Sequence, residues 1–102
     1  MDKRKPHYSL AAIKKQFREP KGFRITVSAQ DFAFGALGLE RQGILDLVQS
    51  VETREFYKSM TSYGSSSIWQ DVYHVRYEDS VLYLKFTKDT DGHYLLISLK
   101  DR

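Results

Sequence analysis

The sequence predicts one α+β domain over residues 1–102, with N-terminal helices packed on one face of a C-terminal antiparallel β-sheet. Apolar residues recur at helical spacing in the first half of the chain. The second half changes to β-branched and aromatic runs joined by short, turn-like segments. A length of 102 residues is enough for one hydrophobic core and too short for two.

The first predicted helix runs through LAAIKKQF, with Ser9 as its N-cap. Leu10, Ile13 and Phe17 form an apolar stripe at i, i+3 and i+7, and Pro20 marks the end of the helix. The segment FRITV that follows is typical of a short strand.

Two more helices are predicted before the strand-rich half of the chain. The first begins at Ser28, which is the expected N-cap, and ends at Gly38. The second lies in ERQGILDLVQSV, where apolar residues repeat at helical spacing: Ile44, Leu45, Val48 and Val51.

Four strand-like runs follow, in the order EFYKSM, QDVYHVRY, SVLYLKFTK and HYLLISLK. The connections SYGSSS, EDS and DTDG are short, so neighbouring strands are predicted to be antiparallel hairpin partners. Asp91-Gly92 is a strong signal for a tight hairpin turn. The sequence therefore predicts a meander.

Alternation along the strands assigns side chains to the two faces of the sheet. Leu82, Leu84 and Phe86 are expected to point to one face, which leaves Tyr83 and Lys85 on the other. The helices can cover one face only. The uncovered face is therefore expected to display tyrosines and lysines, a surface on which nucleobases stack and phosphates are neutralised.

The same alternation in the last run places Leu95, Ile97 and Leu99 on the apolar face. Leu96 and Lys100 are then expected on the opposite face.

Composition excludes several classes of protein. No apolar run approaches the roughly 20 residues of a membrane span, and MDKRKPHYSL lacks the apolar segment of a secretory signal. The absence of cysteine excludes disulfides and thiolate metal sites, and a cytoplasmic protein is expected. Glycine-rich phosphate loops, HExxH and Gly-x-Ser-x-Gly motifs are absent as well, so no metal or cofactor is expected.

The charge is distributed unevenly along the chain. Residues 1–24 carry eight bases and two acids, a net of +6, and the remainder carries eight bases and eleven acids, a net of −3. The basic first quarter is a candidate phosphate-facing surface. A solvated helix face explains the same charges equally well.

Lysine, tyrosine, glutamine, arginine and histidine suit one reaction that needs no metal, which is RNA cleavage by the substrate's own 2′-hydroxyl. The protein then supplies a base for the 2′ proton, a cation for the phosphorane and an acid for the leaving 5′-oxygen. Composition alone leaves this chemistry as one option among several.

The runs EFYKSMTSY, IWQDVY and VLYLKFT, in this order, resemble the MqsR (motility quorum-sensing regulator) family of bacterial toxins. The opening KRKPH and the closing LISLK are also similar to that family. The resemblance implies a RelE-like fold and a ribosome-independent mRNA endoribonuclease, or mRNA interferase, that cuts at GC-containing sites, typically GCU. It also implies a zinc-binding antitoxin, MqsA, which binds operator DNA, so that the toxin reaches DNA only through its partner.

The residues linked to activity in that family fall on Lys58, Gln70 and Tyr83, which are the expected catalytic residues. Tyr83 is expected to transfer a proton, and neighbouring lysines are expected to lower its pKa. Lys58 is expected to stabilise the phosphorane. Gln70 is expected to orient a base or a phosphate oxygen by hydrogen bonds.

Four further residues are expected to bind RNA. His74 and Arg76 lie two apart in one strand, on the same predicted face, and Lys85 and Lys100 supply additional cations. Some relatives have arginine where this chain has His74, and the KDTDGH hairpin is slightly longer. Both departures bear on base preference rather than on activity.

Each site residue has a purely structural alternative. Lys58, on the expected face of Phe56 and Met60, can be a sheet-edge lysine with its amine in water, and Tyr83 can be an ordinary half-buried strand residue. Trp69 is expected in the core rather than as a stacking platform. For the whole chain, the alternative is a non-catalytic RNA- or ribosome-binding module. A DNA-binding regulator has less support, because no helix has a recognition-helix signature.

Overall fold

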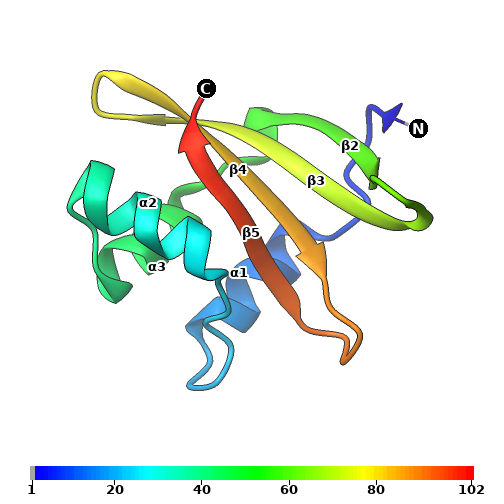
Figure 1. Ribbon diagram of the computed structural model, residues 1–102, viewed down its shortest axis with the longest axis horizontal. Helices are drawn as coiled ribbons and strands as arrows, with labels where there is room; N and C mark the ends of the chain where they lie inside the picture. The colour runs from blue at the N-terminus through cyan, green and yellow to red at the C-terminus, as the bar shows by residue number, and fades with distance from the viewer. Residues whose placement is uncertain (1) are drawn as a thin grey trace.

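Three helices and an antiparallel sheet make up the computed structural model, which describes residues 2–102. The helices gather on one side of the sheet, and the N-terminus lies beside β2 at the sheet's edge (Figure 1). The α+β class with helices on one face is confirmed. In chain order the elements are β1 (Asp2–Lys3), α1 (Leu10–Arg18), α2 (Val27–Leu37), α3 (Arg41–Ser50), the 3₁₀ turn η1 (Thr53–Glu55), β2 (Phe56–Ser62), β3 (Ser65–Tyr77), β4 (Ser80–Lys88) and β5 (Tyr94–Asp101).

The strands follow one another across the sheet in the order β1-β2-β3-β4-β5, and every neighbouring pair is antiparallel. The predicted meander is confirmed, including the turn at Gly92, whose positive φ of 84° suits glycine. The sequence did not indicate β1. In it, Asp2 pairs with Met60 and Lys3 with Ser59, so the basic N-terminal segment supplies an edge strand.

The hydrophobic core fills the space between the helices and one face of the sheet. Ser9 caps α1 as predicted, accepting a hydrogen bond from the backbone N–H of Ala12 at 3.1 Å. The predicted stripe of Leu10, Ile13 and Phe17 is buried. It packs in one cluster with residues from the sheet, among them Tyr73, Val75, Leu82, Leu84, Phe86, Leu96 and Leu99.

The segment between α1 and α2 differs from the prediction in two respects. FRITV forms no strand but a single parallel bridge between Ile25 and Leu96, next to hydrogen bonds that join Arg24 and Thr26 to the backbone of Leu96. Thr26, not Ser28, is the N-cap of α2, because its side chain accepts from the N–H of Ala29 while also donating to the carbonyl of Ile97. The contact with β5 therefore fixes where α2 begins.

The predicted face assignment of β5 is partly wrong because the strand contains a bulge. Lys85 pairs with Ser98 and Phe86 pairs with Leu96, so Ile97 is skipped in the register. Leu96 is consequently fully buried on the helix side, where alternation placed it on the open face. Leu95 pairs with Thr87 and lies on the open face. Leu99 is on the helix side as predicted.

Asp71 fastens the segment between β1 and α1 to the sheet. Its buried carboxylate accepts hydrogen bonds from the backbone N–H groups of His7 (3.1 Å) and Tyr8 (2.8 Å) and from the Ser59 hydroxyl (2.6 Å). Next to it, Trp69 stacks on the His7 ring with centroids 5.3 Å apart. The prediction that Trp69 lies in the core is therefore wrong, since its ring covers the N-terminal segment instead.

Within residues 2–102, no helix is long and apolar enough to cross a membrane.

Candidate active site

The face of the sheet opposite the helices carries the predicted site residues in aligned rows. In the first row His74 of β3 faces Tyr83 of β4, which in turn faces Lys100 of β5. In the second row Lys58 of β2 and Lys85 of β4 lie on either side of Val72. Paired residues in antiparallel strands share a face. The structure thus brings residues from four strands together on the uncovered face.

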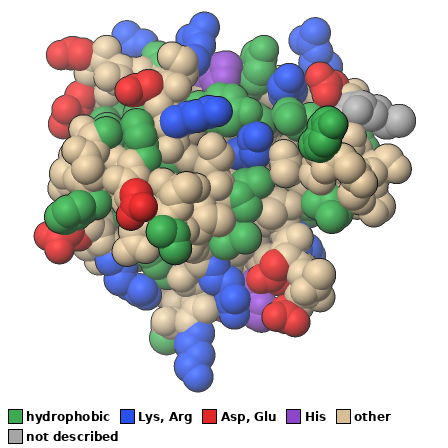
Figure 2. Space-filling view, in the orientation of Figure 1, with side chains coloured by type: hydrophobic (Ala, Val, Ile, Leu, Met, Phe, Trp, Pro, Cys, Tyr) green, Lys and Arg blue, Asp and Glu red, His purple; other side chains and the backbone are tan. Residues whose placement is uncertain are grey.

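Lysine side chains surround Tyr83. The Nζ atom of Lys100 lies 5.0 Å from the centroid of the Tyr83 ring, and that of Lys85 lies 5.6 Å from it. Burial lowers the pKa of Lys85, and the positive charges of Lys100 and Lys58 lower it further. In the upper part of Figure 2, Lys and Arg side chains lie near a histidine and hydrophobic groups, and further Lys and Arg side chains lie in the lower part. The face is therefore cationic and aromatic at once.

Tyr83 titrates differently from the prediction. Burial raises its pKa above the ordinary value of 10.0, Tyr57 raises it further, and only the charge of Lys58 opposes this. The expectation that the pKa of Tyr83 is lowered is wrong, because loss of hydration outweighs the effect of Lys58, which does lower the pKa as expected. Tyr83 is therefore a protonated phenol at neutral pH, suited to donate a proton or a hydrogen bond.

A bulge in β2 brings Lys58 to the open face. Phe56 pairs with Tyr73 and Lys58 pairs with Val72, so Tyr57 is the extra residue. Phe56 packs against the core, whereas Lys58 points the other way, so the prediction that the two share a face is wrong. Lys58 Nζ lies 3.5 Å from the carboxylate of Asp2 in β1.

Gln70 lies near the middle of β3 and Arg76 near its C-terminal end, on the same face. Gln70 pairs with Met60 of β2 and lies four residues from His74, a separation of about 13 Å at roughly 3.3 Å per residue. Arg76 is exposed, and its backbone N–H donates to Glu55 at 3.1 Å. Gln70 is thus placed to contact a different part of a bound chain from Tyr83.

Two residues of the site have no counterpart among the predicted ones. Tyr57 is half-exposed and stacks on His74 with centroids 4.1 Å apart and ring planes 19° from parallel. Asp2 reaches Lys58 from the neighbouring strand. Neither could be found by alternation, since a bulge and a two-residue edge strand leave no periodic signal.

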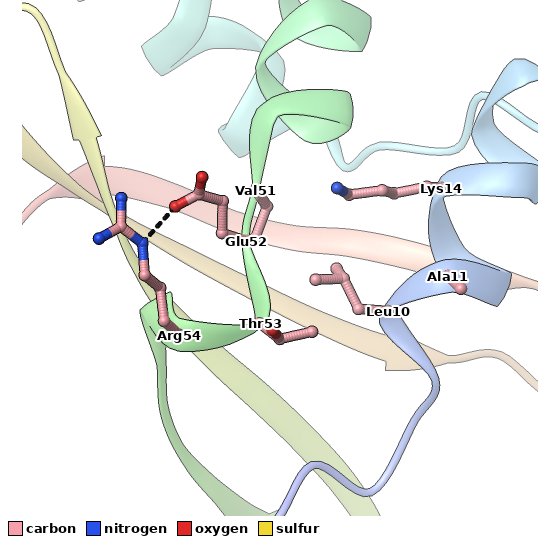
Figure 3. Close-up of a pocket in the computed structure, with 7 residues that line it drawn as sticks. All are labelled: Leu10, Ala11, Lys14, Val51, Glu52, Thr53 and Arg54. Atoms are coloured by element: carbon pink, nitrogen blue, oxygen red, sulfur yellow. Dashed lines mark hydrogen bonds and ion pairs between the residues drawn. The ribbon is translucent and has the colours of Figure 1, made fainter.

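A hollow of about 520 Å³ between α1 and η1 lies apart from these residues (Figure 3). Lys14 points into it from α1, and Arg54 pairs with Glu52 at its rim. Its lining residues are Leu10, Ala11, Lys14, Val51, Glu52, Thr53 and Arg54. None of them is a predicted site residue.

The turn between β4 and β5 places Asp89, Asp91 and His93 with side-chain ligand atoms within 4.8 Å of one another. Hydrogen bonds inside the turn account for this grouping. The Asp89 carboxylate accepts from the backbone N–H groups of Asp91 and His93, each at 2.9 Å. The bond from His93 is the main reason that the pKa of Asp89 is lowered, and Arg24 lies 3.7 Å from its other oxygen.

The fold and this face define a small α+β protein whose open sheet suits a single-stranded polyanion with stackable bases. The family model described as "Motility quorum-sensing regulator, toxin of MqsA" matches residues 5–101. The chain is also 38% identical over 102 residues to the "mRNA interferase toxin MqsR" of Escherichia coli (strain K12), and the match covers the whole of both chains. The chain therefore belongs to the MqsR toxin family, as the resemblance of its motifs implies.

Proposed function

We propose that this chain is an endoribonuclease, an mRNA interferase toxin that cleaves mRNA by attack of the substrate's own 2′-hydroxyl and so inhibits translation and growth. The observation that carries the proposal is the group of Lys58, Lys85 and Lys100 around Tyr83 on the open face. The end-to-end match to an mRNA interferase supports the same reaction class.

The reaction requires a proton to leave the 2′-oxygen and another to reach the 5′-oxygen. The 2′-oxygen attacks phosphorus, the bond from phosphorus to the 5′-oxygen breaks, and a 2′,3′-cyclic phosphate and a 5′-hydroxyl result. Tyr83 is the acid for the leaving oxygen, because its raised pKa keeps the phenol protonated. Lys85 is the base for the 2′ proton, because its lowered pKa makes the neutral amine more accessible than in an exposed lysine.

The remaining cations stabilise charge. Lys58 and Lys100 flank the reacting phosphate, where fixed positive groups favour the phosphorane over the ground state. Arg76 extends the same face along β3 and contacts a neighbouring phosphate, and the uncharged His74 imidazole can donate a hydrogen bond to one. Gln70, in the middle of β3 and two residues from Val72, hydrogen-bonds a base or a phosphate oxygen.

The test is cleavage of a defined transcript in EDTA, with the products' ends identified. Wild type should leave 2′,3′-cyclic phosphate and 5′-hydroxyl ends, and Tyr83→Phe should cut about 10²- to 10⁴-fold more slowly. Tyr63→Phe is the matched control, since Tyr63 is fully exposed at the β2–β3 turn. A requirement for divalent metal would refute the mechanism. RNA that is bound but left intact would favour a non-catalytic RNA- or ribosome-binding module.

We infer that cleavage is independent of the ribosome and occurs at GC-containing sites of the GCU type. Support comes from family membership and from Gln70, an amide on the open face that can read base edges. Mapping the cuts in a ribosome-free reaction with purified transcript tests both points. Cuts spread evenly over all dinucleotides would contradict the sequence preference.

The partner we propose is an MqsA-like, zinc-binding antitoxin in the cytoplasm, through which alone the toxin reaches operator DNA. The family description "toxin of MqsA" supports such a partner. The sheet edges are partly occupied, with β1 against β2 and residues 24–26 against Leu96 of β5. Strand addition is therefore best accommodated along the later part of β5. Co-expression with the antitoxin should restore growth and yield a complex that co-purifies.

A further inference from the structure

Tyr57 owes its exposure to the β2 bulge, which aims the side chains of Tyr57 and Lys58 outward in succession. One face of the Tyr57 ring lies on His74, with centroids 4.1 Å apart, and 51% of the residue remains exposed. His74 therefore covers one ring face, and about half of the residue stays open to solvent beside the Lys58 ammonium. His74 in turn contacts Tyr83, with centroids 5.8 Å apart, so Tyr57 ends a row of rings that leads to the site.

Two hollows meet at Tyr57. The first, of about 280 Å³, is lined by Asp2, Lys3, Arg4, Tyr57 and Lys58. The second, of about 420 Å³, is lined by Arg54, Glu55, Phe56, Tyr57, His74 and Arg76. Each hollow is lined in part by basic side chains. An RNA strand that crosses Tyr57 therefore meets cations for its phosphates on both sides of the ring.

We propose that Tyr57 is the platform on which a nucleobase next to the scissile bond stacks, which makes it a base-binding residue of this enzyme. Flat rings with a free face bind bases of single strands irrespective of sequence. Lys58 Nζ lies 5.6 Å from the centroid of the same ring. When a base stacks on Tyr57, the phosphate of that nucleotide therefore lies near the Lys58 ammonium. The inference rests on the proposed RNA cleavage and adds the position of one base to it.

The contact with His74 restricts the Tyr57 ring. The His74 ring stacks against one face of the Tyr57 ring. Burial lowers the pKa of His74, and the charge of Arg102 lowers it further, so the imidazole is neutral at pH 7. A neutral imidazole stacks on tyrosine and keeps an N–H that can donate to a phosphate oxygen. The ring is thereby held ready before RNA binds, which reduces the entropy lost on binding.

The experiment uses an RNA oligonucleotide in which a GCU triplet and the nucleotides directly 5′ and 3′ of it are 2′-deoxynucleotides, so that the nucleophile is absent and binding is read without cleavage. 2-Aminopurine is placed directly 5′ or directly 3′ of the triplet, and its fluorescence falls when it stacks. We expect the fluorescence at one of the two positions to be quenched by wild type, Tyr57→Phe and Tyr57→Trp. Tyr57→Ala should lose the quenching, and Tyr63→Ala, the matched control at the β2–β3 turn, should keep it.

Cleavage kinetics on the all-ribose RNA give a second reading. Tyr57→Ala should lose about 5- to 150-fold in kcat/KM, the range expected for one base–aromatic stack, mainly through KM. Tyr57→Phe should keep the wild-type kcat/KM, because stacking needs the ring and not the hydroxyl. If wild type quenches the fluorescence at neither position, the proposed base-binding role of Tyr57 is wrong. It is also wrong if Tyr57→Ala leaves both the quenching and kcat/KM unchanged. Absence of cleavage by wild type while quenching persists instead overturns the proposed function and leaves base binding standing.

Discussion

Lys58 and Asp2 form an ion pair across β1 and β2, with Nζ 3.5 Å from the carboxylate oxygen. The acid comes from the edge strand and the base from the proposed site, so a substrate phosphate must compete with Asp2 for the Lys58 ammonium. We therefore expect Asp2 to weaken RNA binding at the lysine that we assign to the phosphorane.

Replacing Asp2 by asparagine should strengthen RNA binding. Both partners are partly exposed, and such pairs are worth about 0–1 kcal/mol, so the gain in affinity should reach about fivefold at most. Binding of the deoxy-substituted oligonucleotide at low and high salt measures it, and the gain should shrink at high salt. Asp31→Asn on α2 removes the same charge from an exposed position away from the sheet. Equal effects of the two variants would contradict a local role for Asp2.

Lys85→Met should stabilise the fold and impair cleavage. The lowered pKa of Lys85 means that the folded state disfavours its charged form, while an apolar side chain of similar length avoids that penalty. In the wild type the unfolded state holds the Lys85 proton more tightly, so stability should rise as pH rises towards 10.5. Urea unfolding at several pH values should show a weaker rise in the variant. Lys15→Met, at an exposed position in α1, should leave stability and cleavage unchanged.

Tyr73→Phe should leave stability at pH 7 unchanged or raise it by about 1 kcal/mol. Among the described residues the Tyr73 hydroxyl is buried without a hydrogen-bond partner, so its removal leaves no group newly unpaired. Burial, with the charge of Asp71, raises the pKa of Tyr73 to about 12. The folded state therefore holds that proton more tightly, and wild-type stability should fall between pH 10 and about 12. Urea titrations across this range should show a shallower fall in Tyr73→Phe, and an unchanged slope would exclude Tyr73 as the cause.

Asp71→Ala should release the N-terminal segment. The substitution leaves the backbone N–H groups of His7 and Tyr8 without their acceptor and removes the partner of the Ser59 hydroxyl. We expect a loss of about 2–3 kcal/mol in the free energy of unfolding. Faster tryptic cleavage within residues 3–5 should accompany it. Asp31→Ala serves as the control, and if both variants resist trypsin equally, Asp71 does not hold the segment.

Local patterns predicted much of this fold. The stripe of Leu10, Ile13 and Phe17 and the Ser9 cap depend on residues within two turns of each other, so α1 follows from spacing alone. Gly38, with φ of 67°, likewise ends α2 where the sequence indicates. The start of α2 at Thr26 depends on a contact with β5, which spacing does not reveal.

Alternation failed at the register shifts next to Tyr57 in β2 and Ile97 in β5. One extra residue in a strand moves every following side chain to the other face, and neither Tyr57 nor Ile97 differs in type from its neighbours. The assignment of Lys58, Gln70 and Tyr83 came from ordered motifs rather than from geometry. Their common face, the stack under Tyr57 and the Asp2 contact depend on strand register, which a single sequence does not specify.

The strand β5 is the last element to be translated, which has a consequence for the timing of toxicity. Lys58 lies in β2, and Lys100 is placed against Tyr83 only when β5 pairs with β4. A nascent chain that ends before residue 100 therefore lacks the complete group of lysines. Translation of this message should release no active nuclease until β5 has emerged from the ribosome, and products truncated before β5 should be harmless to the cell that makes them.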